Sequence, residues 1–186
     1  HTPENSSLAD IYNCIIRKHI SSSDYLMLLD DDTLVEPYFF SELFLALKYN
    51  YDIYLPKILN NGLIVSPGKM YYFIGSYWKK IEAGLNQSKY IVAINSGMTI
   101  SGNYLKNVYK GYDEKLKFYG TDTYFMKQAV LNKSLIYILD VELEHDLSFF
   151  NADIELESKV DRFNSMIYAL RVIFSKSSVL LKFLLT

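Results

Sequence analysis

The segment Tyr25-Leu26-Met27-Leu28-Leu29-Asp30-Asp31-Asp32-Thr33 places three consecutive aspartates directly after a short apolar run. A short unbroken apolar run is typical of a strand that is buried on both faces of a parallel sheet. Ligands of open α/β sheets bind beyond the carboxyl ends of such strands, which is where these aspartates lie. The segment therefore predicts an α/β fold with a ligand site at residues 30–32.

The aspartate cluster also predicts a metal ion. Three adjacent carboxylates repel one another unless a cation lies among them. Asp30 and Asp32 alternate to the same side of an extended chain, so both can reach one ion. Oxygen ligands suit a hard divalent metal, so we expect Mg²⁺ or Mn²⁺ at these two residues. The alternative is a solvated acidic turn whose aspartates cap the next helix.

Two other acidic motifs do not fit this segment. An EF-hand loop would require an oxygen ligand at position 34 and a glycine at position 35, where the chain has Leu34 and Val35. A haloacid-dehalogenase-type phosphatase would require its motif threonine at position 34, which is again Leu34. The cluster therefore belongs to neither class.

Apolar residues recur along the rest of the chain at spacings that alternate between helix and strand. Helical spacing is found over residues 8–20, 37–47, 122–130 and from 155 onward, with Ser6 or Ser7 as the first N-cap. Strands are expected over residues 53–59, 63–65, 90–100 and 135–141, with an interruption at Asn95-Ser96-Gly97. Residues 69–88 are rich in aromatics and remain ambiguous. Strands alternating with helices predict an α/β fold with a mostly parallel sheet flanked by helices.

Composition limits the classes of protein to which the chain can belong. Its 186 residues suit one domain with a sizeable core, and 50% of them are hydrophobic, which is typical of a globular protein. The formal net charge of −2 gives no general reason to expect nucleic-acid binding. The one cysteine, Cys14, cannot form an intrachain disulfide, and no signal peptide is visible at the start. We therefore expect a cytoplasmic location and no nucleic-acid partner.

Several motifs occur along the chain in the order typical of one enzyme family. Residues 5–13 and 24–33 resemble the middle of the family-2 glycosyltransferases, which have the GT-A fold and include bacterial rhamnosyltransferase-like enzymes. The resemblance covers roughly residues 5 to 175. Its further motifs are Ile94-Asn95-Ser96-Gly97-Met98, Gly111-Tyr112-Asp113-Glu114-Lys115-Leu116, Gly120-Thr121-Asp122 and His145-Asp146-Leu147-Ser148.

The resemblance implies a Rossmann-like GT-A fold and an enzymatic activity. That activity is the inverting, metal-dependent transfer of a sugar from a nucleotide-diphosphate donor to a saccharide or lipid-linked acceptor in polysaccharide biosynthesis. Asp30 and Asp31 would contact the donor, and Asp30 and Asp32 would hold Mn²⁺ or Mg²⁺ together with His145. Asp122 would be the catalytic base.

The segment Asn95-Ser96-Gly97 would lie under the donor sugar and contribute to donor binding. Each implied role has a structural alternative. Asn95, Ser96 and Gly97 also fit a bulge or turn, and Asp122 fits a first-turn acid stabilised by the helix dipole. His145 also fits an exposed histidine after a strand.

The resemblance also predicts how the chain is organised. The family's first two strand-and-helix units, which bind the base and ribose, have no counterpart here, so the GT-A-like domain at 1–154 is expected to be N-terminally incomplete. A truncated transferase-like remnant or interaction module without activity is the alternative to an enzyme.

Residues 155–186 are expected to form a C-terminal helical segment. Its first part would cover the sheet through Leu156, Val160, Phe163 and Ile167. The apolar tail at 179–185 predicts contact with the inner face of the cytoplasmic membrane or with a second copy of the chain.

Overall fold

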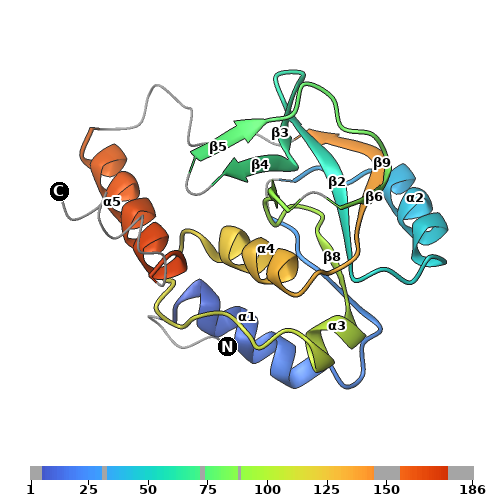
Figure 1. The fold of residues 1–186 in the computed structure, drawn as a ribbon, viewed down its shortest axis with the longest axis horizontal. Coiled ribbons are helices and arrows are strands. Elements are labelled where there is room, and N and C mark those ends of the chain that lie inside the picture. Colours follow the sequence, from blue (N-terminus) through green and yellow to red (C-terminus); the bar gives the residue numbers. More distant parts are fainter. Residues whose placement is uncertain (1–5, 31–32, 72–73, 88, 145–155, 176–186) are drawn as a thin grey trace.

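The computed structural model describes residues 6–30, 33–71, 74–87, 89–144 and 156–175. Within these ranges the helices are α1 (Leu8–His19), α2 (Pro37–Leu47), α3 (Gly102–Asn107), α4 (Thr121–Leu131) and α5 (Leu156–Ile173). The strands are β1 (Tyr25–Met27), β2 (Ile53–Asn60), β3 (Leu63–Ser66), β4 (Gly68–Tyr71), β5 (Ile74–Tyr77), β6 (Gly84–Asn86), β7 (Ile91–Val92), β8 (Thr99–Ser101) and β9 (Ile136–Glu144). Figure 1 shows their arrangement. The chain is therefore a mixed α/β protein, as the sequence predicts.

The main sheet is mostly antiparallel, so the prediction of a mostly parallel sheet was wrong. Its strand order is β1-β8-β2-β9-β6, with β3 paired to β2. Only β2 and β9 pair in parallel among the described strands. The physical reason is that β8 lies between β1 and β2 and runs opposite to both. Because β1, β2 and β9 still share one direction, their carboxyl ends lie at the same edge of the sheet.

The stretch over residues 69–88, which is ambiguous in the sequence, contains antiparallel strands: β4 and β5 of a second sheet, and β6 of the main sheet. A second sheet has the order β5-β4-β7, with Lys69 paired to Ser76 on one side and to Ile91 on the other. All four residues of β5 are exposed. An exposed strand has no apolar alternation, which is why its periodicity could not be read from the sequence.

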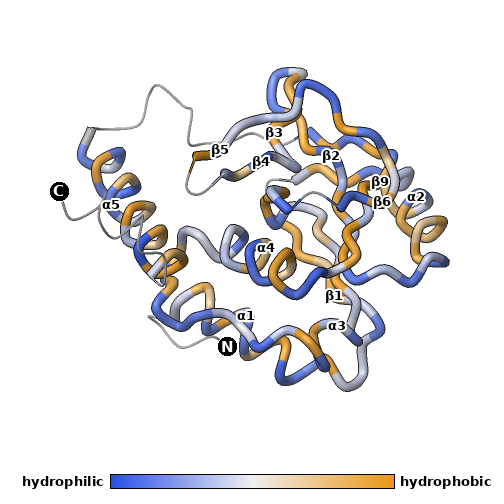
Figure 2. Tube along the Cα trace, in the orientation of Figure 1, coloured by the Kyte–Doolittle hydropathy of each residue, from blue (hydrophilic) through white to orange (hydrophobic). Residues whose placement is uncertain are grey.

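Helices cover both faces of the main sheet, with α2 on one face and the other helices on the opposite face. In β2, Ile53 and Leu55 pack into a core cluster with residues of α1, α3, α4 and α5, whereas Tyr54 packs into a second cluster with Phe39 and Leu43 of α2. Figure 2 shows apolar stretches gathered along the strands and on α2 and α4. Because successive side chains of a strand point to opposite faces, one strand supplies both clusters.

The helix α1 begins with a capping box. Ser7 Oγ accepts a hydrogen bond from Asp10 N at 3.1 Å, and the Asp10 carboxylate accepts one from Ser7 N at 3.1 Å. This arrangement satisfies two backbone donors at the helix start. Ser7 is one of the two N-cap residues that the sequence predicts.

The helix α5 packs on the domain through its C-terminal half. Ala169 and Ile173 are buried in the core, whereas Val160 is 50% and Phe163 is 54% exposed. The expectation that Val160 and Phe163 cover the sheet was therefore wrong, because the helix meets the domain only near its end. Within the described part of the chain, the helices lack the length and apolar composition needed to cross a bilayer.

Candidate functional site

The start of β8 meets the end of β1 at the predicted site. Leu28 N donates to Met98 O at 2.9 Å, and Gly97 N donates to Leu28 O at 2.8 Å. Because the two strands are antiparallel, the beginning of one lies beside the end of the other. The aspartate cluster and the Asn95-Ser96-Gly97 turn are thereby brought together.

Ser96 connects this turn to the first aspartate. Its hydroxyl Oγ donates a short hydrogen bond to the Asp30 carboxylate, and its own side chain is buried. Ser96 therefore holds Asp30 in a fixed orientation at the sheet edge.

Gly97 is required by the backbone and by packing. Its φ is +76°, and a Cβ added there would lie 2.8 Å from Pro56 Cγ and 3.1 Å from Leu143 Cδ1. A left-handed conformation and a contact this close both favour glycine. The structure accounts for Gly97 without any ligand contact, so its predicted role in donor binding stays a prediction.

Asn95 faces a residue that sequence reasoning missed. Its Nδ2 donates to the hydroxyl oxygen of Tyr12 at 3.3 Å, whereas its Oδ1 is buried and has no partner among the described residues. Tyr12 lies on α1, and its ring packs against Tyr112 at 5.2 Å between centroids. The available signal was a hydroxyl-bearing aromatic inside the first motif, but Tyr12 also fits the apolar spacing of the helix.

Asp122 lies in the first turn of α4, as predicted. Its Oδ1 accepts a hydrogen bond from Thr123 N at 2.6 Å. Burial raises the pKa of Asp122, the hydrogen bonds from Thr123 oppose this change, and the negative charge of Asp30 raises the pKa further. A carboxylate with a raised pKa is better matched to accepting a proton near neutral pH.

Tyr12 joins the two acids into one site. Burial raises the pKa of its hydroxyl, and the negative charges of Asp30 and Asp122 raise it further. Electrostatic effects of this kind require the groups to be near one another. The described site is therefore the set Tyr12, Asn95, Ser96 and Asp30, which hydrogen bonds and chain connectivity link, with Asp122 within electrostatic range of it.

A cavity of about 320 Å³ opens beside Asp122. Asp122 and Thr123 form one wall, and Ser66, Lys69 and Ser76 of the small sheet and the strand before it contribute to the other. Its volume is at the lower end of the range for small-molecule sites. The cavity gives a ligand access to the Asp122 carboxylate.

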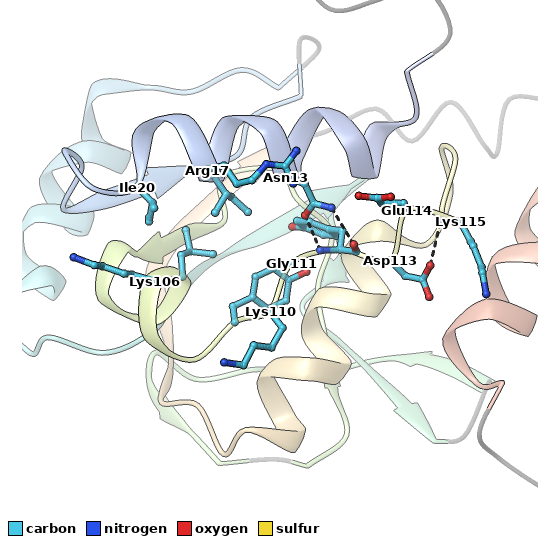
Figure 3. A pocket seen from close by; sticks show the side chains of 13 residues that line it. Asn13, Arg17, Ile20, Lys106, Lys110, Gly111, Asp113, Glu114 and Lys115 are labelled. Carbon is cyan, nitrogen blue, oxygen red and sulfur yellow. Dashed lines mark hydrogen bonds between the residues drawn. The ribbon is translucent and has the colours of Figure 1, made fainter.

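A larger cavity of about 760 Å³ lies against α1, α3 and the loop at 109–115. Figure 3 shows that its three lysines, Lys106, Lys110 and Lys115, point in different directions, so these lysines do not converge on one anion. In its wall, Asn13 exchanges two hydrogen bonds with the backbone of Tyr112. The Gly111-Tyr112-Asp113 motif is therefore held by a structural contact in this wall.

Three predicted site residues fall outside the described ranges: Asp31, Asp32 and His145. Within those ranges, no three His, Cys, Asp or Glu side chains form a group that could hold a metal. The metal ligands therefore remain a prediction, of which the structure describes only Asp30.

Comparison with known proteins identifies a likeness of fold. No protein-family model and no curated protein matches the chain. The crystal structure of A197 from STIV matches with a TM-score of 0.52 and 16% sequence identity, over 76% of this chain and 68% of that one. At this level of identity the likeness concerns the fold alone.

Proposed function

We propose that this chain carries the catalytic residues of an inverting, metal-dependent glycosyltransferase of the GT-A type. The observation that supports this most is the convergence of Asp30, Asp122 and Tyr12 from three separate segments of the chain. Beyond the effect of burial, the charges of the two acids raise the pKa of Tyr12, and the charge of Asp30 raises the pKa of Asp122. Perturbed titratable groups beside a cavity are typical of catalytic sites. The donor would be a nucleotide-diphosphate sugar, and the acceptor a saccharide or lipid-linked hydroxyl in polysaccharide biosynthesis.

The residues present fit a divalent cation. Asp30 and Asp122 are close enough for one negative charge to raise the pKa of the other. Asp30, with Asp32 and His145, would hold Mn²⁺ or Mg²⁺. When bound, such an ion offsets charge on the leaving diphosphate.

The chain's own groups would divide the remaining work. Asp122 would take the proton from the acceptor hydroxyl, which enters through the cavity beside it. Ser96 would keep the Asp30 carboxylate oriented towards the donor. One base and one displacement give inversion at the anomeric carbon, by the same logic as in inverting glycoside hydrolysis.

Calorimetry with the full chain tests the proposal. We expect UDP-, dTDP- or GDP-sugars to bind in the presence of Mn²⁺ and to lose affinity when the ion is chelated. Asp32→Ala should abolish the part of the donor affinity that depends on Mn²⁺, because removing one carboxylate removes an oxygen ligand of the ion. Asp24→Ala is the matched control, since Asp24 is an exposed acid just before β1. Metal-independent binding, or no binding of any donor, would favour the inactive remnant.

We also propose that the C-terminal segment contacts the membrane surface. Val160 and Phe163 leave apolar surface exposed on α5, which also carries Lys159, Arg162 and Arg171. The apolar residues 179–185 follow in the sequence. Amphipathic segments with basic residues bind the interface of anionic membranes.

Co-sedimentation with anionic liposomes measures this contact. A chain ending at Ser175 lacks the apolar residues 179–185 together with Lys176 and Lys182. Each basic residue near the surface contributes about 1 kcal/mol, so we expect the full chain to sediment more than this shorter chain. Equal sedimentation of both forms would contradict a membrane role of residues 176–186, and no sedimentation of either form would contradict one for α5. A concentration-dependent molecular mass of the full chain alone would point to a second copy as the partner.

A further inference from the structure

The Tyr12–Asn95 pair has unused hydrogen-bonding capacity inside the site. Asn95 is 8% exposed, and its buried Oδ1 accepts no hydrogen bond from any described residue. A buried acceptor without a donor costs free energy, and native proteins keep few such groups. The oxygen therefore requires a donor that the described residues do not supply.

The Tyr12 hydroxyl is left with a proton to donate. Its oxygen already accepts from Asn95 Nδ2 at 3.3 Å, and no hydrogen bond that its proton donates is found among the described residues. Burial and two nearby carboxylates keep the phenol protonated at neutral pH. The ring is held against Tyr112, so the hydroxyl has a defined position. The pair thus presents one donor and one acceptor side by side.

This combination selects a hydroxyl group over other small ligand groups. A hydroxyl both donates and accepts, so it can satisfy Asn95 Oδ1 and Tyr12 together. The diphosphate of a nucleotide sugar offers only acceptors at neutral pH, so it cannot donate to Asn95 Oδ1. The surroundings are therefore suited to a polyhydroxylated, uncharged group.

We propose that Tyr12, together with Asn95, binds one hydroxyl of the transferred sugar. This inference rests on the proposed function and identifies the part of the donor that the pair contacts. The leaving diphosphate would lie on the Asp30 side and the attacking hydroxyl on the Asp122 side. In an in-line displacement the transferred sugar occupies the space between them. Tyr12 contacts Asn95, whose neighbour Ser96 holds Asp30, so the pair lies beside that space.

Calorimetry with three ligand pairs on the full chain tests the inference: UDP-glucose with UDP, dTDP-glucose with dTDP, and GDP-mannose with GDP. All titrations contain Mg²⁺, and the quantity measured is the affinity gained from the sugar. We expect Tyr12→Phe to reduce this gain by about 3- to 10-fold, which corresponds to one hydrogen bond. The affinity for the nucleotide without its sugar should stay unchanged. Asn95→Ala should reduce it as well. Tyr119→Phe removes a hydroxyl from a half-buried tyrosine outside the site and is the control.

Deoxy analogues of the best-binding sugar identify the hydroxyl. We expect one analogue, which lacks the hydroxyl bound by Tyr12, to be insensitive to Tyr12→Phe, because the interaction is already absent. Two results overturn the inference and leave the proposed function intact. One is that Tyr12→Phe keeps the affinity gained from the sugar; the other is that it lowers the affinity for the nucleotide alone as much as the affinity for the nucleotide sugar. If the wild-type chain binds none of the six ligands, both the inference and the proposed function fall.

Discussion

Asp122→Asn is expected to lower turnover by about 10²–10⁴-fold and to leave donor affinity nearly unchanged. An amide keeps the shape of the carboxylate and can still accept the hydrogen bond from Thr123 N, but it cannot take a proton from the acceptor. The measurement compares kcat with donor affinity for the nucleotide sugar that binds best. If affinity falls as much as turnover, Asp122 is a binding residue and not the base.

The same substitution should raise thermal stability at neutral pH. Burial raises the pKa of Asp122 above its ordinary value of 3.8, so the charged form is disfavoured in the folded state. Between the unfolded and folded pKa values the folded state binds more protons, so its stability falls as pH rises through this window. Asparagine carries no charge and avoids this loss.

Melting temperatures as a function of pH check the stability effect. We expect the melting temperature of Asp122→Asn to match that of the wild type below pH 3.8 and to exceed it at neutral pH. Asp113→Asn is the control, because Asp113 also accepts a backbone hydrogen bond, from Lys115 N at 3.0 Å, but lies outside the site. A mutant that is less stable at neutral pH would show that the Asp122 carboxylate serves the fold and not the chemistry.

Local signals in the sequence predicted most elements of the fold. The helix expected over 122–130 is α4, and the strands expected over 53–59 and 63–65 are β2 and β3, which are joined by a turn at Asn61-Gly62. Both follow from short-range physics: helical spacing in one case, and a turn dipeptide that tolerates positive φ in the other. Asp30, Asn95, Ser96 and Asp122 could be named as site residues because each lies in a motif at the end of such an element.

Features that depend on long-range contacts could not be predicted. The direction of β8 depends on the path of the segment before it, in which β4, β5 and β7 form a separate small sheet and β6 joins the main sheet. Tyr12 has the spacing of an apolar helix residue, and only its approach to Asn95 reveals a polar role. The periodicity of α5 indicates a helix but not which half of it meets the domain. Each of these outcomes is decided by contacts between segments distant in the sequence.

Asn13→Ala is expected to reduce the free energy of unfolding by about 2–4 kcal/mol. Asn13 Nδ2 donates to Tyr112 O at 3.0 Å, and Tyr112 N donates to Asn13 Oδ1 at 2.8 Å. Both contacts are buried, so truncation leaves one donor and one acceptor of the Tyr112 backbone without a partner. Urea denaturation measures the loss. Asn103→Ala removes an exposed amide contact with Asn107 and should cost little by comparison.

A second substitution tests whether Asn13 acts through the turn at Gly111. Gly111 has a φ of +97°, and a Cβ there would lie 2.9 Å from Asn13 Oδ1, so Gly111→Ala should disturb the same contact from the other side. Because the two substitutions remove one shared interaction, the double variant should lose less stability than the sum of the single variants. Full additivity would mean that the turn is held independently of Asn13, by the packing of the Tyr112 ring against Tyr12 and Tyr109. In that case the ring, and not the amide, would be the contact that fixes this motif beside the site.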